Sequence, residues 1–530
     1  MPAMTRLCVS ILVHDVAQAK RDIADAIEAG AEMIELRLDL LPDLVVAGQL
    51  TKACSVPCVV TCRSAAEGGK CDLPDAHRVQ FLREVMQAPH NGLVSNYCDV
   101  EFSALRSMTG HGIVPAHLII SHHDYAGRPA RLYNLLEEMN EHPAAVNKVA
   151  WSPRSIRDCQ EAFELLQART RPTIAICMGE HGAISRILAR KFGAFLTFAS
   201  VRDDARTAPG QATIADMKEI YRWDDVNPET SVYGVVGSPI RHSMSPVAHN
   251  AAFDQAGIDA VYVPLLVNEG YESFKAFMET FVTGPGPLRL SGLSITIPHK
   301  ENAYRYLASM GEGRHIDTNA VYVRAVNTIS VNRAADGKVE LFGTNTDYNA
   351  ILDVLTAAMN IDRKALAKLR VAVIGAGGVG RTATAALAAM GASVIVYNRS
   401  TERSDALVEE FDGRHGSVTA LPIASLPLAD CDIYINATAL GMSPNVQDSP
   451  FGDGAPKLGR GRVVFDTVYN PIRTKLLEQA ESVGATTING VEMFIRQAAA
   501  QYELWTKQPA PMELMRKVVT ARLAPPPTAA

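Results

Sequence analysis

A lysine interrupts an apolar run in the first half of the chain. Lys148 stands in NKVAWS, where the hydrophobic residues otherwise predict a buried strand. A buried ammonium ion is costly, and a neutral lysine amine can attack a ketone to form a Schiff base. His122 and His123 end a neighbouring run, LIISHH, and a histidine beside an imine can move protons. Schiff-base chemistry on a carbonyl substrate is one hypothesis for these residue types.

The same residues also admit structural interpretations. Lys148 can extend its amine from a strand end to solvent, or it can pair with Glu101. The histidine pair can belong to a metal site, although no third ligand stands at a telling spacing, and we expect none. Taken alone, the residue types leave the role of Lys148 open.

A glycine-rich turn indicates a second kind of chemistry far along the chain. In VAVIGAGGVG, an apolar strand-like run meets the turn, and an alanine-rich helical segment follows. A GxGxxG turn in this context binds the pyrophosphate of a dinucleotide at the helix N-terminus. We therefore predict that the turn contacts a cofactor through Gly375, Ala376, Gly377, Gly378, Val379 and Gly380.

The residues after the next strand distinguish NADP from NAD. The strand SVIVYN ends in Asn398, where an NAD site would carry Asp or Glu for the ribose 2′-hydroxyl. Arg399 and Arg403 follow, and guanidinium groups suit a 2′-phosphate. We predict NADP, held at this end by Asn398, Arg399, Ser400 and Arg403. Two surface arginines without a role are the alternative.

A lysine and an aspartate precede this turn. SITIPHK places Lys300 after a strand, and GTNTD supplies Asp347. If both converge on one hydroxyl group, they form a proton relay for the reduction of a carbonyl. A surface lysine and an aspartate at a helix N-cap are the alternatives. Upstream, Ser243 and Ser245 alternate with Met244 and can hold a small anion together, unless they form only a serine-rich turn.

Eight short apolar runs must position the first set of groups. They are LCVSILV from Leu7, MIELRLD from Met33, PCVVTCR from Pro57, LVSNYCDVE from Leu93, HLIISHHD from His117, NKVAWS from Asn147, PTIAICMG from Pro172 and FLTFASV from Phe195. Helical patterns separate most of them, for example AQAKRDIADAIEAG with Gly30 as its expected C-cap. Alternating strands and helices in this number predict a (β/α)8 barrel.

Polar residues stand in or just after these runs. Because the carboxyl ends of barrel strands meet in one mouth, we expect their side chains to gather there. The residues are Glu35, Arg37, Arg63, Glu67, Asp99, Glu101, His122, His123, Asp124, Lys148, Arg186, Thr207 and Gln211.

Composition excludes several classes of protein. The chain has 530 residues, too many for one core, and its net charge of −6 argues against a nucleic-acid-binding protein. No apolar run approaches the roughly 18 residues that span a bilayer. The nine cysteines are odd in number and scattered, so we expect reduced thiols. The start, MPAMTRLCVSILVHD, has no signal or transit layout, which favours a cytoplasmic protein, or a plastid one if a transit segment has been removed.

Six motifs in the first part resemble type I 3-dehydroquinate dehydratase over residues 1 to about 222. They are ELRLD, TCRSAAEGG, SHHDY, NKVAWSP, MGEHGAISR and TAPGQA. The resemblance implies that Lys148 forms an imine with the substrate ketone and that His123, oriented by Glu67, moves the protons. It further implies substrate contacts from Glu35, Arg37, Arg63, Arg186, Thr207 and Gln211. The family more often has Ser where Thr207 stands, and Thr keeps the hydroxyl group.

Nine motifs in the rest of the chain are similar to those of shikimate dehydrogenase over residues about 232 to 523. They are GSPIRHSMSP, SITIPHK, AVNT, GTNTD, GAGGVGR, NRSTER, NATALGMSP, DTVYNP and NGVEMFIRQAAAQ. The similarity implies that Lys300 and Asp347 are catalytic. Shikimate contacts are implied for Ser243, Ser245, Thr296, Asn327, Thr346, Tyr469 and Gln497, and nicotinamide contacts for Asn436, Thr438, Leu440 and Met442. Family members often have Asn where Ser294 stands, which puts one substrate-side contact in question.

Together the resemblances imply a bifunctional shikimate-pathway enzyme, joined as in plants, that converts 3-dehydroquinate through 3-dehydroshikimate to shikimate. We expect the dehydratase barrel at residues 1–222, a linker at 223–231 and a shikimate-binding domain at 232–350 and 490–523. We expect a Rossmann NADP-binding domain at 362–489 and a disordered tail at 524–530. The predicted state is a monomer, with neither nucleic acid nor a membrane as partner.

Two other functions stay open at this point. Quinate oxidation with NAD would use the same fold, and Ser243 and Thr346 do not distinguish quinate from shikimate. Arg399 and Arg403 argue against NAD. A metabolite sensor would keep the folds without turnover, but it would be expected to lack some of Lys148, His123, Lys300 and Asp347, all of which are present.

Overall fold

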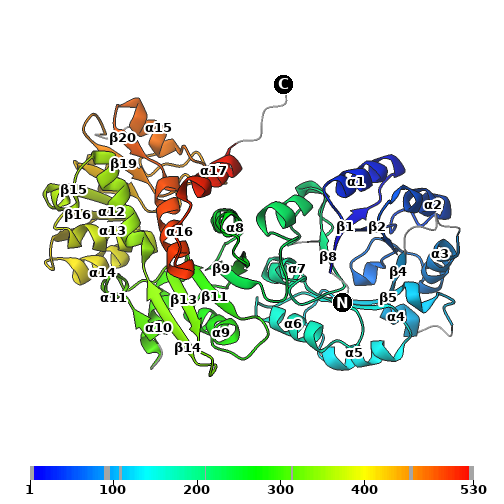
Figure 1. Ribbon diagram of the computed structural model, residues 1–530. Helices are drawn as coiled ribbons and strands as arrows, with labels where there is room; N and C mark the ends of the chain where they lie inside the picture. Colours follow the sequence, from blue (N-terminus) through cyan, green and yellow to red (C-terminus); the bar gives the residue numbers. More distant parts are fainter. Residues whose placement is uncertain are drawn as a thin grey trace. The chain divides into compact units, whose positions relative to one another are not determined.

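The computed structural model describes residues 5–88, 96–106, 110–208, 210–311, 314–452 and 458–524 (Figure 1). By its internal contacts the chain divides into two compact units. The first comprises residues 1–233, 258–268 and 276–290, and the second comprises residues 234–257, 269–275 and 291–530. This division does not separate the two domains expected after residue 232, so the predicted boundaries stay predictions. Of the predicted tail, residues 525–530 lie outside the described residues.

An eight-stranded parallel sheet forms the core of the first unit and confirms the predicted (β/α)8 barrel. Its spatial order is β7–β6–β5–β4–β3–β2–β1–β8. The Phe195 N–H donates to the Thr173 carbonyl at 2.9 Å and joins the β8 end to the β7 end, so the barrel is nearly closed. The strands are β1 (Arg6–Leu12), β2 (Met33–Arg37), β3 (Cys58–Thr61), β4 (Tyr97–Glu101), β5 (Leu118–Asp124), β6 (Val146–Trp151), β7 (Thr173–Cys177) and β8 (Leu196–Ala199).

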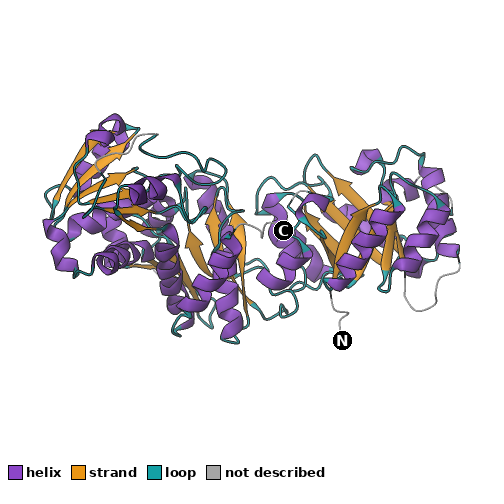
Figure 2. Cartoon of the chain, turned by 90° about the horizontal axis from the view of Figure 1, so that it is seen from above, coloured by secondary structure: helices purple, strands orange, loops and turns teal. Residues whose placement is uncertain are grey.

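Helices surround these strands (Figure 2). They are α1 (Val16–Glu28), α2 (Leu44–Ala53), α3 (Asp75–Gln87), α4 (Phe102–Arg106), α5 (Leu132–Glu141), α6 (Asp158–Ala168) and α7 (Ala183–Ile187). Ala29, not Gly30, is the C-cap of α1. Gly30 follows with φ +90°, a left-handed conformation that glycine adopts at little steric cost, and it reverses the chain into β2.

The pleat of the strands stacks an apolar layer and a polar layer inside the barrel. The apolar layer includes Cys8, Met33, Val59, Ile119, Val146, Ile174 and Leu196. Side chains two residues further along a strand point to the same face. At that spacing the strands carry Ser10, Glu35, Thr61, Ser121 and Lys148, all buried. The polar layer therefore lies toward the carboxyl ends of the strands, at the predicted mouth.

A second sheet of six strands has the order β10–β9–β11–β13–β14–β12. Strand β13 runs antiparallel to β11 and β14, whereas β12 and β14 are parallel. The strands are β9 (Ser231–Gly237), β10 (Ala260–Leu266), β11 (Leu290–Ile295), β12 (Arg314–Ile316), β13 (Thr328–Arg333) and β14 (Val339–Thr344). Helices α8 (Ser245–Gln255), α9 (Tyr271–Phe281), α10 (Lys300–Ser309) and α11 (Thr318–Val323) lie between these strands in sequence.

The third sheet has the strand order of a dinucleotide-binding fold. Six parallel strands follow the order β17–β16–β15–β18–β19–β20, which is 3-2-1-4-5-6 when counted from β15, and this confirms the predicted Rossmann sheet. The order reverses between β15 and β18, and ligands bind at the carboxyl ends of strands at such a reversal. The strands are β15 (Arg370–Ile374), β16 (Ser393–Asn398), β17 (Ser417–Pro422), β18 (Ile433–Asn436), β19 (Val463–Asp466) and β20 (Thr486–Ile488).

Two long helices connect the sheets of the second unit. Helix α12 (Thr346–Met359) packs against α13 (Gly378–Ala389), and the chain continues through α14 (Thr401–Phe411) and α15 (Lys475–Ser482). Helix α16 (Gly490–Thr506) then returns to the second sheet, as predicted, where Trp505 donates to the Ile329 carbonyl at 3.2 Å. Helix α17 (Met512–Leu523) packs against α8 and α16. Within the described residues, none of the helices has the length and hydropathy needed to cross a membrane.

Trp223, in the segment expected as a linker, is packed against the barrel. Its side chain is fully buried, with the Arg190 guanidinium 5.3 Å from the ring centroid. The indole N–H donates to Glu32 at 3.3 Å, and Arg190 donates to the Trp223 carbonyl at 2.7 Å. The start of this segment is therefore held to the first unit by a large apolar contact.

We predict that Trp223→Ala destabilises the barrel by about 3–5 kcal/mol, because the substitution leaves a cavity and removes the contact with Arg190. Denaturant unfolding of the full chain measures the effect. The exposed residue Val45, 67% accessible in α2, is the control, and Val45→Ala should change stability by less than about 0.5 kcal/mol. Equal midpoints for the two variants would contradict the prediction.

Candidate active sites

Asp99 brings two buried cations together inside the barrel. Its Oδ2 atom lies 2.8 Å from Lys148 Nζ, and its Oδ1 atom lies 2.8 Å from Arg63 Nη2. All three side chains are buried. Burial alone would raise the pKa of Asp99, but Arg63 and Lys148 hold it well below its usual range. An ionised carboxylate therefore compensates both cations at neutral pH.

The amine of Lys148 stays inside the barrel. Glu35 Oε1 lies 3.5 Å from Nζ, and the Phe198 ring centroid lies 4.6 Å from it. Glu101, the partner considered from sequence, pairs instead with Arg78. Both structural interpretations of Lys148, extension to solvent and pairing with Glu101, are therefore wrong. The lysine is held in the polar layer toward the carboxyl ends of the strands.

His123 and Glu67 form a hydrogen-bonded pair. His123 Nδ1 lies 3.0 Å from Glu67 Oε2, which also accepts the His123 backbone N–H at 3.0 Å. Burial, Arg63 and Lys148 together hold the pKa of His123 well below its usual value. Burial raises the pKa of Glu67 to about 7, against the opposing effect of Arg63. With Nδ1 directed at Glu67, the Nε2 atom of a neutral imidazole is left for proton transfer.

The other predicted substrate contacts of the barrel are held by hydrogen bonds of their own. Arg37 donates to both oxygens of Asp39, at 3.0 and 2.5 Å. Arg186 is buried in α7 and donates to the last carbonyl of β7 at 3.1 Å, and burial lowers its pKa to about 10. Gln211 Oε1 accepts the Thr207 N–H at 3.0 Å, a hydrogen bond within the loop after β8. The arrangement presents guanidinium groups that suit a carboxylate ligand.

In the second unit, two helix starts bring Lys300 to Asp347. Lys300 is the first residue of α10 and Asp347 the second of α12, and Nζ lies 2.6 Å from Oδ2. Both side chains are buried, so the alternative of a surface lysine is wrong. Asn345 caps α12 by accepting the Tyr348 N–H, so the N-cap role considered for Asp347 belongs to Asn345.

The predicted shikimate contacts form two groups. In the first, Asn327 Nδ2 donates to Thr346 Oγ1 at 2.9 Å, and the Thr346 N–H donates to Asn327 Oδ1 at 2.8 Å. Because Thr346 precedes Asp347, this pair lies beside the lysine and aspartate. In the second, Tyr469 is hydrogen-bonded to Ser243, whose Oγ accepts the Ser245 N–H at 3.3 Å.

Two further predicted contacts lie on neighbouring elements. Thr296 follows β11 and packs so closely on Gly237 that an added Cβ there would lie 2.5 Å from Thr296 Cγ2. Gln497 on α16 accepts the Gln501 side-chain N–H at 2.8 Å.

The glycine-rich turn leaves open space at the N-terminus of α13. Gly375 adopts φ +105°, and an added Cβ at Gly380 would lie 2.0 Å from the Gly375 carbonyl oxygen. An added Cβ at Gly377 would meet nothing within 4 Å. The turn lies against the lysine, because a Cβ at Gly378 would be 3.2 Å from Lys300 Cδ. A pyrophosphate therefore fits at Gly377, next to the Lys300–Asp347 pair.

The end of β16 presents positive charge beside the turn. Asn398 Oδ1 accepts the Ala376 N–H at 3.3 Å, and its Nδ2 donates to the Ser400 carbonyl at 2.8 Å. Arg399 and Arg403 are exposed. A phosphate group can pair with guanidiniums in this position.

The loop after β18 is fastened by Asn436. Its Oδ1 accepts from the backbone N–H and the hydroxyl of Thr438, at 3.1 and 2.6 Å. Its Nδ2 donates to the Leu440 carbonyl at 3.2 Å and to Asp466 Oδ1 at 3.0 Å. Leu440 and Met442 are exposed at the reversal of the sheet, 37% and 43% accessible, as cofactor-facing residues would be. Burial raises the pKa of Asp466 to about 6.

Four family models match the chain in succession. Residues 7–228 match type I 3-dehydroquinase, and residues 235–329 match the shikimate dehydrogenase substrate binding domain. Residues 356–468 match shikimate / quinate 5-dehydrogenase, and residues 490–520 match the shikimate 5′-dehydrogenase C-terminal domain. The matches follow the order of the motifs in the sequence.

A relative from Arabidopsis thaliana spans both parts. The chloroplastic bifunctional 3-dehydroquinate dehydratase/shikimate dehydrogenase of that plant is 34% identical over 532 residues, covering 97% of this chain and 84% of its own length. The chain belongs to this bifunctional family. The NADP+ shikimate dehydrogenase of Methanopyrus kandleri is 37% identical over 56% of this chain and 98% of its own length. A crystal structure of a shikimate dehydrogenase in complex with NADP+ is 32% identical, covers 57% of this chain and 98% of its own, and has a TM-score of 0.47.

In this dehydratase/dehydrogenase, sequence reasoning missed several residues of the polar clusters. Asp99 was noted on its strand without a role, although its spacing of two from Glu101 places both on one face. Ser121 bridges Arg63 and Asp99, at 2.7 and 2.5 Å. Gln501 lies four residues after Gln497, a spacing that puts both on one face of a helix and could have indicated it.

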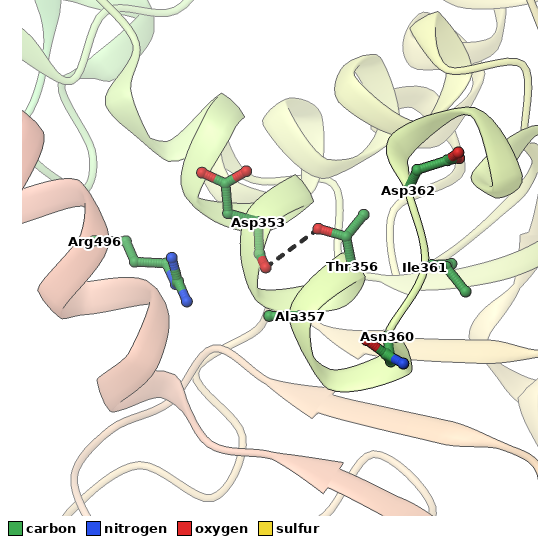
Figure 3. Close-up of a pocket in the computed structure, with 7 residues that line it drawn as sticks. All are labelled: Asp353, Thr356, Ala357, Asn360, Ile361, Asp362 and Arg496. Carbon is green, nitrogen blue, oxygen red and sulfur yellow. Dashed lines mark hydrogen bonds between the residues drawn. The ribbon is translucent and has the colours of Figure 1, made fainter.

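A surface hollow is lined by residues of α12, by the residues that follow it and by Arg496 of α16 (Figure 3). Its volume is about 440 Å³, and none of the predicted site residues lines it. The lining residues are Asp353, Thr356, Ala357, Asn360, Ile361, Asp362 and Arg496. Asp347 stands at the opposite end of α12 from Asn360, so this hollow is not the candidate active site.

Two alanine substitutions in the glycine-rich turn should affect different properties, one NADPH binding and the other stability. Gly377→Ala should leave the unfolding temperature unchanged, because its Cβ position is open, but should weaken NADPH binding at least about tenfold, because the methyl group takes the space of the pyrophosphate. Gly380→Ala should lower the unfolding temperature, because its Cβ would clash with the Gly375 carbonyl. Thermal unfolding and an NADPH fluorescence titration measure the two effects.

Gly311 is the control for an added methyl group, since a Cβ there also meets nothing within 4 Å. Gly311→Ala should change neither quantity. An unchanged NADPH affinity in Gly377→Ala would contradict the placement of the cofactor.

Proposed function

We propose that this chain catalyses two consecutive reactions. The barrel dehydrates 3-dehydroquinate to 3-dehydroshikimate, and the second unit reduces that product to shikimate with NADPH. The observation that carries the proposal is the presence of two different buried lysine sites in one chain. Lys148 lies in the barrel with the His123–Glu67 pair, whereas Lys300 is paired with Asp347 against the glycine-rich turn.

In the barrel, the amine of Lys148 attacks the ketone of 3-dehydroquinate, and loss of water leaves an iminium ion. The iminium acidifies the neighbouring carbon, from which His123 Nε2 removes a proton. The same imidazolium then protonates the departing hydroxyl group, which leaves as water. Hydrolysis of the imine releases 3-dehydroshikimate and restores the amine. The iminium accepts the electron pair, so the step requires no metal ion.

The surrounding charges support these steps. Arg63, Arg37 and Arg186 bind the carboxylate and hydroxyl groups of the substrate, together with Glu35, and Thr207 and Gln211 close over it. Glu67 accepts the His123 Nδ1–H and so keeps Nε2 directed at the substrate. The substrate carboxylate adds negative charge next to the buried arginines, which lowers the cost of their burial.

In the second unit, Lys300 donates to the carbonyl oxygen of 3-dehydroshikimate, and the Lys300–Asp347 pair delivers the proton that makes this oxygen a hydroxyl group. Ser243, Ser245 and Tyr469 bind the carboxylate, while Thr296, Asn327, Thr346 and Gln497 bind the hydroxyl groups. A reduced nicotinamide supplies a hydride when it is bound. The turn from Gly375 to Gly380 would hold its pyrophosphate, and the loop containing Asn436, Thr438, Leu440 and Met442 would border its ring.

The charge at the end of β16 favours NADP over NAD. Asn398 stands where an NAD site has a carboxylate, and Arg399 and Arg403 form no ion pair with any residue that the structure describes. Quinate oxidation with NAD is therefore less well supported than shikimate formation with NADPH. The monomeric state and the cytoplasmic location stay predictions, and sedimentation equilibrium of the purified chain tests the first.

Lys148→Ala should separate the two activities. The variant should fail to consume NADPH when given 3-dehydroquinate, because no imine forms, and should consume it at the normal rate when given 3-dehydroshikimate. Loss of NADPH absorbance in one coupled assay measures both, and borohydride should trap 3-dehydroquinate covalently only on the natural chain. Lys52→Ala, at an exposed position of α2, is the matched control and should resemble the natural chain. If the natural chain binds both substrates without consuming NADPH, it is a sensor and the catalytic roles are wrong.

We predict that the ionisation of Glu67 sets the acid limb of the pH–rate profile of dehydration. The raised pKa of Glu67, about 7, means that dehydration falls as pH falls through 7. A protonated Glu67 donates to His123 Nδ1, so the imidazole proton moves to Nε2, which can then no longer act as the base. The rate as a function of pH should lose this limb in Glu67→Gln, while the reductase profile of the same variant stays unchanged. A limb that persists at the same pH would assign it to another group.

The raised pKa of Glu67 also makes the stability of the folded chain depend on pH. Between its unfolded value of 4.5 and its folded value of about 7, Glu67 binds more protons in the native state than in the unfolded chain. Its contribution to stability therefore decreases as pH rises through this window, and the decrease should be absent in Glu67→Gln.

A further inference from the structure

A chain of buried hydrogen bonds links three segments of the second unit. Ser294 Oγ donates to Gln501 Oε1 at 2.7 Å, and Gln501 Nε2 donates to Thr328 Oγ1 at 3.1 Å. Thr328 Oγ1 then donates to Asn327 Oδ1 at 2.7 Å. All four side chains are buried, between 0% and 6% accessible, so each bond forms away from water. Such networks are costly when one member loses its partner.

Thr328 is the member that decides the direction of the bonds. A hydroxyl group has one proton to donate, and here the proton goes to Asn327 while a lone pair accepts from Gln501. The Thr346 backbone N–H can only donate, so Asn327 must direct its oxygen at it. The Thr346 N–H thus fixes the Asn327 amide in one orientation. Thr328 donates its proton to the same oxygen and must therefore accept from Gln501.

The bond to Thr328 fixes Gln501 in the same way. One Gln501 side-chain N–H donates to Thr328 and the other to Gln497 Oε1 at 2.8 Å. The Gln501 oxygen accepts from Ser294, so both the oxygen and the nitrogen of its side-chain amide are hydrogen-bonded. Gln497 is consequently held with its oxygen toward Gln501 and its nitrogen toward the Phe494 carbonyl at 3.0 Å.

We propose that Thr328 is a positioning residue for the substrate of the dehydrogenase. Through one hydroxyl group it couples the orientation of Asn327, on the strand side, to that of Gln497, on the returning helix α16. The inference rests on the proposed binding of the substrate hydroxyl groups by Asn327 and Gln497. Thr328 itself touches neither substrate nor cofactor in this role, and it acts through the two amides.

The test is Thr328→Val in the full chain, since valine keeps the shape of threonine without its hydroxyl group. The KM for shikimate should rise about tenfold or more, because two hydrogen bonds are lost and a Gln501 N–H is left unpaired. The KM for NADP+, the dehydratase rate and the pH profile of the reductase should stay unchanged. Thr328→Ser, which restores the hydroxyl group, should return the KM for shikimate to within about twofold.

Thr384 supplies the matched control. It is a fully buried threonine in α13 whose hydroxyl group makes no hydrogen bond to the described residues. Thr384→Val should leave every kinetic constant unchanged. If Thr328→Val does not fold, Gln501→Met breaks the same chain of bonds from the other side and should raise the KM for shikimate equally.

The outcomes separate this inference from the proposed function. An unchanged KM for shikimate in Thr328→Val, with or without a lower unfolding temperature, overturns the positioning role, and so does an unchanged KM in Gln501→Met when Thr328→Val does not fold. Asn327→Ala tests the underlying assignment and should raise the same KM by at least as much. If Asn327→Ala has no effect, the substrate site itself is misplaced. If it has an effect and Thr328→Val has none, only the role of Thr328 fails.

Discussion

Charge removed from water must be compensated, and Asp99 meets this requirement for the barrel. Its carboxylate lies 2.8 Å from both Lys148 Nζ and Arg63 Nη2. Removal of one member of a buried ion pair typically costs about 3–5 kcal/mol, because the remaining charge keeps its desolvation penalty. The three side chains, from β4, β6 and the segment just after β3, therefore hold one another in place. Glu35, the second carboxylate near Lys148, completes the polar layer in which the amine is fixed.

In the second unit, the buried lysine is compensated by a carboxylate of its own. Lys300 and Asp347 compensate each other one to one, 2.6 Å apart, at the starts of two helices. In the barrel, Lys148 shares its carboxylate with Arg63, and the amine is fixed in the polar layer. In the second unit, the lysine is paired directly with one carboxylate and lies against the glycine-rich turn. Two lysines in one chain thus support different chemistry because their surroundings differ.

Buried titratable and amide side chains also need hydrogen-bond partners, and these partners set their orientation. Burial raises the pKa of Glu67 to about 7 and lowers that of His123, and the two side chains are hydrogen-bonded to each other at 3.0 Å. Asn327 accepts from the Thr346 N–H, 19 residues further along the chain, and Gln501 donates to Thr328, 173 residues away. Polar groups buried without solvent must find partners in the fold, and the partners come from distant parts of the chain.

The sequence by itself determined the elements and the residue types of both sites. Eight apolar runs, the glycine-rich turn and the Asn398–Arg399 end of a strand are local patterns, and they predicted the barrel, the Rossmann sheet and the choice of NADP. Tertiary structure alone decided which groups meet. It paired Lys148 with Asp99 rather than Glu101, made Asn345 rather than Asp347 the helix cap, and joined Thr328 to Gln501, 173 residues away. Periodicity and turn chemistry act over a few residues, whereas compensation of buried charge and hydrogen-bonding groups depends on neighbours in space.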